Sequence, residues 1–189
     1  MATPPLETQR LLMPPVRLSD ARDIQRHFSN WNVIKRIGAG LSWPYPKDGA
    51  KLYLRDNLLP RVTAGQAHAW TLRLRSNAGE VIGLIEFRMP KDQEADRGFW
   101  LAEAWWGQGL MTEATEAVNQ FVFDTLKLES FIEENAADNP ASRQLKLRCG
   151  AVYIGERYSP HLSGETRSEI WRISAAAWRA SRMKGDSAA

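Results

Sequence analysis

The sequence predicts an α/β (α+β) fold in which a mixed, mostly antiparallel central sheet is flanked by helices. Two segments, 67–75 and 81–89, alternate apolar and polar residues and are separated by Ser-Asn-Ala-Gly79, so they are expected to form a β-hairpin. Strand-like and helix-like segments alternate only in the middle of the chain, which indicates a sheet of mixed strand direction. The content of apolar residues, 43%, is ordinary for a globular protein.

Local signals define the other elements. Asp20 is the expected N-cap of the helix that follows it, and Pro60 is expected to end another helix. Gly150 is expected to end the helix over 139–149. In chain order, the elements expected are a strand over 8–16, helices over 21–28, 31–37 and 47–59, the hairpin of 67–75 and 81–89, a strand over 97–102, a helix over 110–126, a strand over 127–133, a helix over 139–149, and a final hairpin of 152–158 and 167–174.

Length and charge narrow the class of protein. The 189 residues are expected to form a single domain over 1–189, with a core of about 7–174 and a frayed tail from Met183 to Ala189. The formal charge is +3 and the pI is near 9.2, but Lys and Arg form no run, so no nucleic-acid binding is expected. No stretch of about 18 apolar residues occurs, so we expect no membrane span and a cytoplasmic protein.

Cysteine and histidine usage bears on two further classes of site. Cys149 is the only cysteine, which rules out an intrachain disulfide and a cysteine-based metal cage. The three histidines, His27, His68 and His161, lie far apart in sequence, so no metal site is expected. Because no histidine lies near Cys149 in sequence to act as a base, this thiol is expected to pack in the core.

The segment from Gly98 to Glu113 is the most informative about function. It leads from a strand, through a loop that contains Gly107 and Gly109, directly into an amphipathic helix. Glycines allow unusual backbone dihedrals, so consecutive N–H groups can converge on an anion, and a helix start adds unpaired N–H groups and partial positive charge. These features predict a phosphate cradle, although a tight strand-to-helix turn would use the same two glycines.

Two other nucleotide-binding motifs do not fit this segment. A Walker A loop requires Gly-Lys-Ser/Thr, which is absent from the chain. A dinucleotide-binding fingerprint requires a third glycine at the position that Thr112 occupies here. Neither motif therefore explains the two glycines.

The residues around the glycines resemble a known family. Phe-Trp-Leu, an acidic residue, and Trp-Gly-Gln-Gly-Leu-Met-x-Glu-Ala are similar to the acetyl-CoA loop of the GNAT superfamily, and more narrowly to RimJ/RimL-type enzymes, which acetylate ribosomal-protein N-termini. Glu7-Thr-Gln-Arg-Leu11 resembles that group's first strand, and Asp138-Asn-Pro-Ala-Ser142 with 145–150 resembles a later helix, so the resemblance runs from about 7 to 174. Trp106 and Met111 depart from the superfamily pattern Arg/Gln-x-x-Gly-x-Gly/Ala, which leaves pyrophosphate binding to backbone N–H groups.

The resemblance implies the GNAT fold and an N-acetyltransferase in which a primary amine attacks acetyl-CoA directly. It implies that Glu103 takes the amine proton, directly or through water; the alternative is an exposed loop carboxylate. It implies that Ser142 serves the leaving thiolate; the alternative is a helix-start residue. The residues implied to bind acetyl-CoA are Trp100, Leu101, Ala102, Trp106, Gly107, Gln108, Gly109, Leu110, Met111, Thr112 and Asn139, the last of which is also an expected N-cap.

The acceptor stays open at this point. A peptide N-terminus is one expectation; the alternatives are a small amine such as a polyamine or an aminoglycoside, or a non-catalytic acyl-CoA sensor. The expected borders of the acceptor site are the aromatic and polar side chains of Trp31, Trp43, Tyr45, Tyr158 and His161. A homodimer is compatible with the aromatic content, although no motif requires one.

Overall fold

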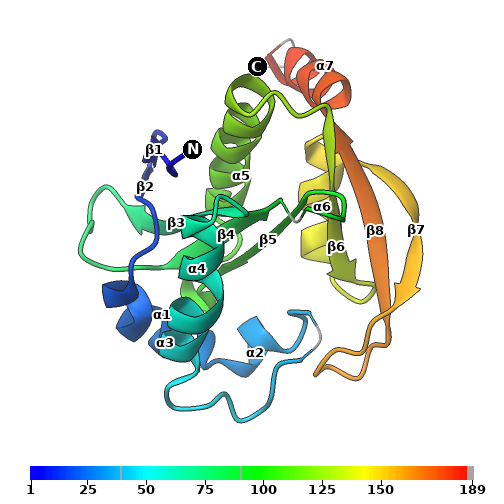
Figure 1. The fold of residues 1–189 in the computed structure, drawn as a ribbon. Coiled ribbons are helices and arrows are strands. Elements are labelled where there is room, and N and C mark those ends of the chain that lie inside the picture. Colours follow the sequence, from blue (N-terminus) through cyan, green and yellow to red (C-terminus); the bar gives the residue numbers. More distant parts are fainter. Residues whose placement is uncertain (39, 90, 187–189) are drawn as a thin grey trace.

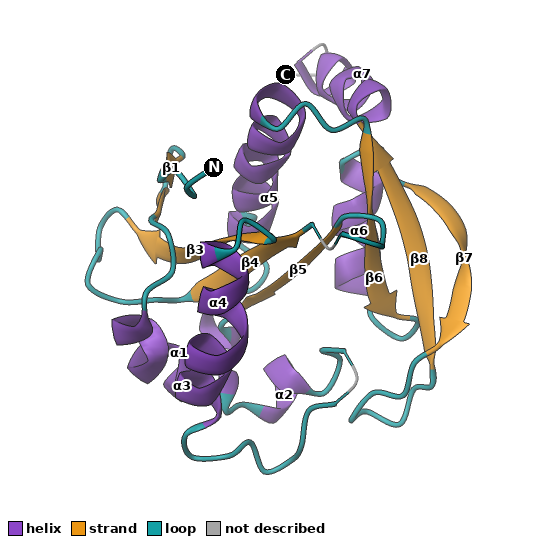
Figure 2. Cartoon of the chain, in the orientation of Figure 1, coloured by secondary structure: helices purple, strands orange, loops and turns teal. Residues whose placement is uncertain are grey.

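The computed structural model describes residues 1–38, 40–89 and 91–186. Its strands are β1 (Leu6–Glu7), β2 (Leu11–Met13), β3 (Ala67–Leu74), β4 (Gly83–Arg88), β5 (Asp96–Leu101), β6 (Ser130–Ala136), β7 (Val152–Tyr158) and β8 (Arg167–Ser174). Its α-helices are α1 (Ala21–Phe28), α2 (Trp31–Ile34), α3 (Gly49–Tyr53), α4 (Leu59–Thr63), α5 (Leu110–Gln120), α6 (Pro140–Arg148) and α7 (Ala175–Asp186). Figure 2 shows these elements by type.

The strands form an eight-stranded sheet in the order β1-β2-β3-β4-β5-β6-β8-β7. Every neighbouring pair is antiparallel except β5 and β6, which run parallel. Helices lie on both sides of this sheet, with α1, α3 and α4 grouped on one side and α5 and α7 at the other end of the view in Figure 1. The predicted α/β fold with a mixed, mostly antiparallel sheet is confirmed.

The two faces of the sheet pack into two separate cores, because successive side chains of a strand point to opposite faces. On β3, Trp70 belongs to the core covered by α5, α6 and α7, whereas its neighbour Ala69 belongs to the core covered by α1 to α4. On β4, Ile85 and Leu84 divide in the same way. Both faces are therefore buried.

The sheet opens between β5 and β6. The register that joins them covers only Asp96↔Ile132 and Arg97↔Glu133 among the described residues, whereas β5 continues to Leu101 and β6 to Ala136. Beyond these two rungs the parallel strands separate and leave a wedge. The loop after β5 and the start of α6 lie at the mouth of this wedge, and both carry predicted site residues.

The N-terminal prediction needs two corrections. Of the range 8–16 expected as one strand, only Leu11–Met13 forms a strand, β2; it pairs antiparallel with β1, which precedes that range, through a turn in which the Thr8 N–H donates to the Leu11 carbonyl. Asp20 does not cap α1: its carboxylate accepts from the Arg17 N–H at 2.8 Å and from Arg73 Nη2 at 2.7 Å, so it closes the 3-10 turn Leu18–Asp20 instead.

Three helix boundaries differ from those expected. Pro60 does not end the helix; it directly follows a π-helical segment, Leu54–Leu58, and the helical backbone continues through it to Thr63. The segment 35–37 forms turns outside α2. Lys127 has a left-handed φ of 60°, so it ends the helix that precedes it and β6 begins only at Ser130.

The chain does not finish as a hairpin with a frayed tail. Residues 175–186 form α7, and its Trp178 is buried in the core against Phe123, with the ring centroids 5.4 Å apart. Its indole N–H also donates to Glu116 Oε2 at 2.8 Å. The predicted frayed segment begins inside this helix; its last residues, 187–189, lie outside the described part of the chain.

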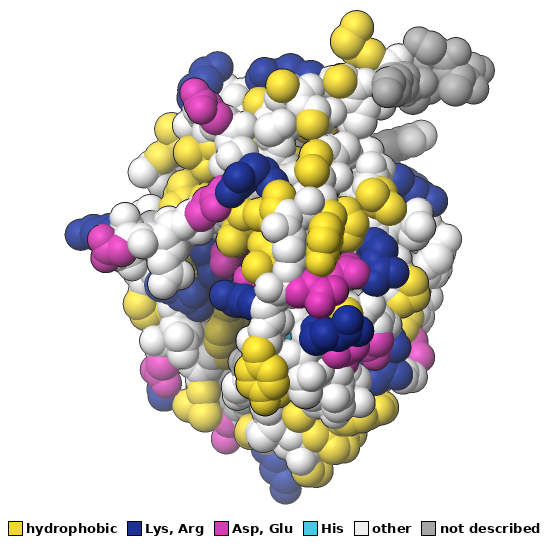
Figure 3. All heavy atoms as spheres, turned by 90° about the vertical axis from the view of Figure 1, so that its right-hand side faces the viewer, with side chains coloured by type: hydrophobic (Ala, Val, Ile, Leu, Met, Phe, Trp, Pro, Cys, Tyr) yellow, Lys and Arg dark blue, Asp and Glu magenta, His cyan; other side chains and the backbone are white. Residues whose placement is uncertain are grey.

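The outer edge of the sheet is β7. Its apolar side chains Val152, Tyr153 and Ile154 are exposed, as is Tyr158. Figure 3 shows this face, where hydrophobic side chains lie next to charges of both signs. Within the described residues, no helix combines the length and apolar character that crossing a bilayer requires.

Candidate acetyl-transfer site

The loop between β5 and α5 has the backbone geometry of an anion cradle. Gly107 and Gly109 have φ of 74° and 75°, values that favour glycine because a Cβ atom clashes in the left-handed region. A Cβ on Gly107 would meet no atom within 4 Å, so the space beside it is open. Gly109 is the N-cap of α5, whose first N–H groups have no helical acceptor. The loop therefore presents backbone donors to an open space.

A cavity of about 420 Å³ lies in front of this loop, at the mouth of the β5–β6 wedge. It extends from the loop to the first turns of α6 and to α2. Its lining includes Asn32, Arg36, Phe99, Trp100, Leu101, Trp105, Trp106, Gly107, Gly109, Leu110, Met111, Thr112, Asn139, Ser142, Gln144 and Arg148. Apolar walls with a few polar groups are typical of a ligand site.

Nine of the eleven residues predicted to bind acetyl-CoA line this cavity. The other two do not belong to its described lining. Ala102 is buried, and its N–H donates to the Ile82 carbonyl at 2.8 Å. Gln108 is exposed, its side chain donates to the Ala104 carbonyl, and its own carbonyl accepts from Arg10 Nη1 at 2.9 Å. These two residues shape the loop from behind.

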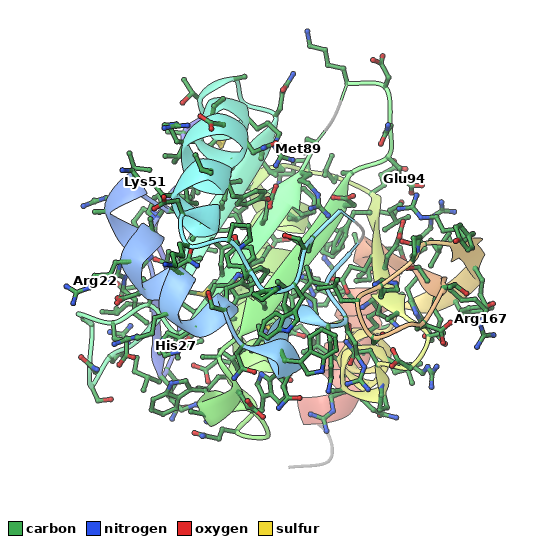
Figure 4. All side chains as sticks on the ribbon, turned by 90° about the horizontal axis from the view of Figure 1, so that it is seen from below. Arg22, His27, Lys51, Met89, Glu94 and Arg167 are labelled. Atoms are coloured by element: carbon green, nitrogen blue, oxygen red, sulfur yellow. The ribbon has the colours of Figure 1, made fainter. Side chains whose placement is uncertain are left out.

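A second cavity, of about 750 Å³, lies beside the first. It draws on α1 through Phe28 and on β8 through Ser168. Figure 4, which views the molecule from below, shows His27 of α1 and Arg167 of β8 on opposite sides, so this cavity is built from both halves of the chain. The two cavities share the lining residues Arg36, Ile37, Phe99, Trp100, Asn139 and Ser142, and they therefore meet at the opening of the wedge.

Ser142 stands at this meeting point. Asn139 is the N-cap of α6 as predicted: its side-chain oxygen accepts from the Ser142 N–H at 3.2 Å, with Pro140 at the first helical position. The Ser142 hydroxyl accepts a hydrogen bond from Lys146 Nζ at 2.8 Å. Burial in the core raises the pKa of the nearby Cys149 thiol, as expected for an unreactive cysteine.

Glu103 lies on the other side of the loop. It is exposed and sits in the 3-10 turn Glu103–Trp105. Its two carboxylate oxygens accept from Asn30 Nδ2 at 2.7 Å and from Asn32 Nδ2 at 2.8 Å. It is not among the described residues that line either cavity, although its partner Asn32 lines the smaller one.

Besides Asp56, which pairs with its neighbour Arg55, the wall of the larger cavity holds three carboxylates that the sequence did not predict. Glu86 of β4, Asp96 of β5 and Glu134 of β6 all line it. Each is paired within the wall: Glu86 accepts from the Tyr53 hydroxyl at 2.5 Å, Asp96 pairs with Arg88, and Glu134 pairs with Arg157 at 2.8 Å. Alternation on a strand could have placed Glu86 on the same face as Leu84, but it gives no sign that a cavity lies there.

Burial and the adjacent Glu86 charge raise the pKa of Tyr53, so this phenol stays protonated and keeps donating to the carboxylate. Of the aromatic and polar side chains expected at the acceptor site, Tyr45 and His161 line the larger cavity. Trp31, Trp43 and Tyr158 are exposed and lie outside its described lining. The His161 ring contacts Ser168 Oγ at 3.0 Å and the Ile37 carbonyl at 3.3 Å.

Comparison with known proteins agrees with this architecture. Residues 10–152, more than half of the chain, match the model of the acetyltransferase (GNAT) domain. A ribosomal-protein-serine acetyltransferase of Escherichia coli (strain K12) is 35% identical over 78 residues, which cover 40% of this chain and 44% of that protein. The matched segment thus spans less than half the length of that relative.

Solved structures show the same fold. A Mycobacterium smegmatis RimJ in complex with CoA-disulfide superimposes with a TM-score of 0.79 at 18% identity, covering 96% of this chain and 93% of that one. The ribosomal-protein-S5-alanine acetyltransferase from Vibrio fischeri has a TM-score of 0.77 at 16% identity, covering 93% and 98%. With the glycine loop, the split β5–β6 pair and the family match in agreement, the chain belongs to the GNAT acetyltransferase family.

Proposed function

We propose that this protein is an N-acetyltransferase in which an amine, the N-terminus of a protein or peptide, attacks the acetyl group of acetyl-CoA directly. The observation that supports the proposal best is the meeting of two cavities at Ser142 and Phe99. One cavity lies against the glycine loop and suits the donor, and the other is left for the acceptor. A direct reaction needs this arrangement because both substrates must be held together in reacting geometry.

The donor side fits acetyl-CoA without a bound cation. Trp106 brings no charge; its indole N–H donates to the Leu101 carbonyl at 2.7 Å. The pyrophosphate would be held by backbone N–H groups around Gly107, Gly109 and the start of α5, where an anion is stabilised. The open space beside Gly107 suits such a group. Arg148 in the same lining would supply positive charge for its phosphates, whereas Arg36 pairs with Asp138 at 3.1 Å.

The proposed catalytic groups are Ser142 and Glu103. In the proposal the Ser142 hydroxyl donates to the sulfur as the thiolate leaves. Its position where the two cavities meet suits this role. Glu103 accepts the amine proton, and because Asn30, the N-cap of α2, and Asn32, in α2, donate to both of its oxygens, it would act through water. The proposed setting is the cytoplasm.

The acceptor is proposed to be a peptide N-terminus that begins with serine or alanine. The names of the relatives supply these two residues. The larger cavity favours a peptide over a polyamine, because its lining carries Arg36, Arg88, Arg97 and Arg157 as well as the carboxylates, which leaves no acidic pocket for a polycation.

The test is a thiol-release assay with acetyl-CoA and a panel of acceptors: peptides that begin with Ser or Ala, the same peptides blocked at the N-terminus, polyamines and aminoglycosides. Release with the free peptides alone supports the proposal. Release with the small amines alone keeps the transfer chemistry and refutes the peptide acceptor. Binding of acetyl-CoA with no release from any acceptor refutes the enzyme and supports a sensor.

The base assignment has its own test in Glu103→Gln. The variant is expected to lower kcat by about 100-fold or more, the usual contribution of a general base, with the Kd for acetyl-CoA unchanged. Glu94→Gln is the matched control, because Glu94 is exposed and pairs with Arg172 away from both described linings. Wild-type turnover in Glu103→Gln with every peptide would refute the assignment.

A further inference from the structure

Lys146 is fully buried on the inner side of α6, and its position is unusual for a lysine. Its Nζ lies 2.8 Å from Ser142 Oγ and 3.4 Å from Glu133 Oε2, and 5.7 Å from the centroid of the Phe99 ring. Taking an ammonium group out of water is costly, and an apolar side chain would fill the same space without that cost. Packing alone therefore gives no reason for an amine here.

Charge balance gives no reason either. Glu133 already pairs with Arg97 across the β5–β6 register, and both side chains have no exposure. One carboxylate and one guanidinium are balanced without a third charge. Protonated Lys146 makes this buried group a net cation, which adds to the cost of the site. Lys146 does ion-pair with Glu133 Oε2, a buried atom without a hydrogen-bond partner among the described residues, but two cations to one carboxylate leave the group with one positive charge that Glu133 does not balance.

The Ser142 hydroxyl links Lys146 to the cavities proposed to hold the substrates. The two residues are four apart on α6, so they lie one turn above each other on the same face. Ser142 lines both cavities, whereas Lys146 is not among the described lining residues of either. The hydroxyl therefore stands between the buried amine and the place where the cavities meet.

We propose that Lys146 is the proton source for the leaving thiolate and acts through Ser142, an inference that rests on the proposed acetyl transfer. The acceptor nitrogen forms a bond to the acetyl carbon and loses a proton through water to Glu103, which passes it to solvent. The carbon–sulfur bond breaks, and its electron pair goes to sulfur. The sulfur takes the hydroxyl proton of Ser142, and the hydroxyl oxygen takes a proton from the Lys146 ammonium. After CoA leaves, neutral Lys146 regains a proton from water through Ser142, so the cycle is balanced.

The surroundings tune Lys146 for this role. Burial lowers the pKa of Lys146 most, Glu133 from β6 raises it, Arg97 from β5 lowers it, and the Cys149 thiol, at the C-cap of α6, raises it; the net result is a lowered pKa. The lowered pKa of Lys146 is closer to the pKa of a thiol, about 8.5, than that of an ordinary lysine is. A smaller pKa difference favours proton transfer from the lysine to the thiolate. As a positioning residue, Lys146 also holds the Ser142 hydroxyl by its hydrogen bond.

The test is Lys146→Met, measured on the full chain with acetyl-CoA and a peptide that the wild type acetylates. We expect kcat to fall by about 100-fold, the KM for acetyl-CoA to stay within about twofold, and the alkaline fall of the wild-type kcat–pH profile to disappear. Ser142→Ala should lower kcat by the same factor. The double variant should lower kcat no further, because the two residues act as one unit. Lys51→Met, an exposed lysine of α3, should behave as wild type.

Several outcomes separate the relay from a structural role. If Lys146→Met keeps the wild-type kcat and its kcat–pH profile still falls at alkaline pH (the alkaline limb), the proton relay from Lys146 through Ser142 is overturned. A variant that loses activity only in proportion to its loss of folded protein, with the limb retained, also overturns it. If Lys146→Met does not fold, Ser142→Ala decides, since a retained alkaline limb there excludes Lys146 as the proton source. A wild type that binds acetyl-CoA but acetylates no acceptor refutes the proposed function itself, and the relay with it.

Discussion

Arg97 and Glu133 are register partners on the parallel strands β5 and β6, and their side chains form an ion pair with no exposure to solvent. Arg97 also donates to the side-chain oxygen of Asn119 at 2.5 Å and to the Thr115 carbonyl at 3.2 Å, both on α5. The pair thus fastens the apex of the wedge to the helix that follows the glycine loop. Removing Glu133 would leave the charges of Arg97 and Lys146 buried without their carboxylate partner.

Glu133→Gln is therefore expected to lower the free energy of unfolding by about 3–5 kcal/mol. Urea denaturation at neutral pH measures this change. Glu129→Gln is the matched control: Glu129 is exposed just before β6, and its loss should change stability by less than about 0.5 kcal/mol. Equal effects of the two variants would contradict the role given to the buried pair.

Glu113 should make stability depend on pH. Its carboxylate accepts from the Thr8 hydroxyl at 2.5 Å, from the Arg10 N–H at 2.7 Å and from Arg10 Nε at 2.6 Å. Burial by itself raises the pKa of Glu113, but these hydrogen bonds outweigh it and hold the pKa below its usual value. A lowered pKa contributes stability above the unfolded-state value, about 4.3, and this contribution is lost as pH falls through the folded-state value.

Glu113→Gln is accordingly expected to melt at a lower temperature than the wild type at neutral pH. The difference should shrink as pH falls below about 4, because the wild-type carboxylate then becomes protonated too. Melting curves of both proteins from neutral to acidic pH measure the effect. A difference that stays constant over this range would show that the charge of Glu113 is not what stabilises the loop.

Gly109→Ala should weaken acetyl-CoA binding. A left-handed conformation costs a residue with a Cβ about 1–2 kcal/mol, and the new methyl carbon would lie 3.5 Å from Arg10 Nη2. If the loop relaxes out of the bound geometry, the Kd rises by roughly 5- to 30-fold, which isothermal titration calorimetry measures. Gly65→Ala carries the same strain at a φ of 69°, with nothing within 4 Å and outside both described linings, so it should leave the Kd unchanged.

Trp178→Ala tests whether α7 is part of the core. The side chain is 2% exposed, packs against Phe123 and donates to Glu116, so its removal is expected to cost about 3–5 kcal/mol of unfolding free energy. Ala180→Ser, exposed on the same helix, is the control and should be near neutral. A near-neutral Trp178→Ala, measured by urea denaturation, would mean that α7 does not dock.

The loop and the helix starts could be predicted because their signals are local. Gly107 and Gly109 predict a left-handed backbone conformation that other residues avoid, and Asn139-Pro140 predicts a helix N-terminus. Both predictions hold without knowledge of the tertiary surroundings. Asp20 shows the limit of local signals. Aspartate is a residue type that favours N-caps, yet one Asp20 oxygen accepts from the Arg17 N–H and the other from Arg73, more than fifty residues away, so neither oxygen caps α1.

By itself the sequence determined the order of the elements from the central hairpin to β8 and the backbone of the glycine loop, since these depend on neighbours along the chain, whereas the family resemblance supplied the residues expected at the cavity. Only the tertiary structure decided that Asn30 and Asn32 hold Glu103, that Glu86 lines the second cavity, and that Lys146 is buried behind Ser142. The reason is physical. A charged residue looks the same in the sequence whether it is exposed or buried, and its loss of solvent depends on strands and helices from distant parts of the chain that pack around it.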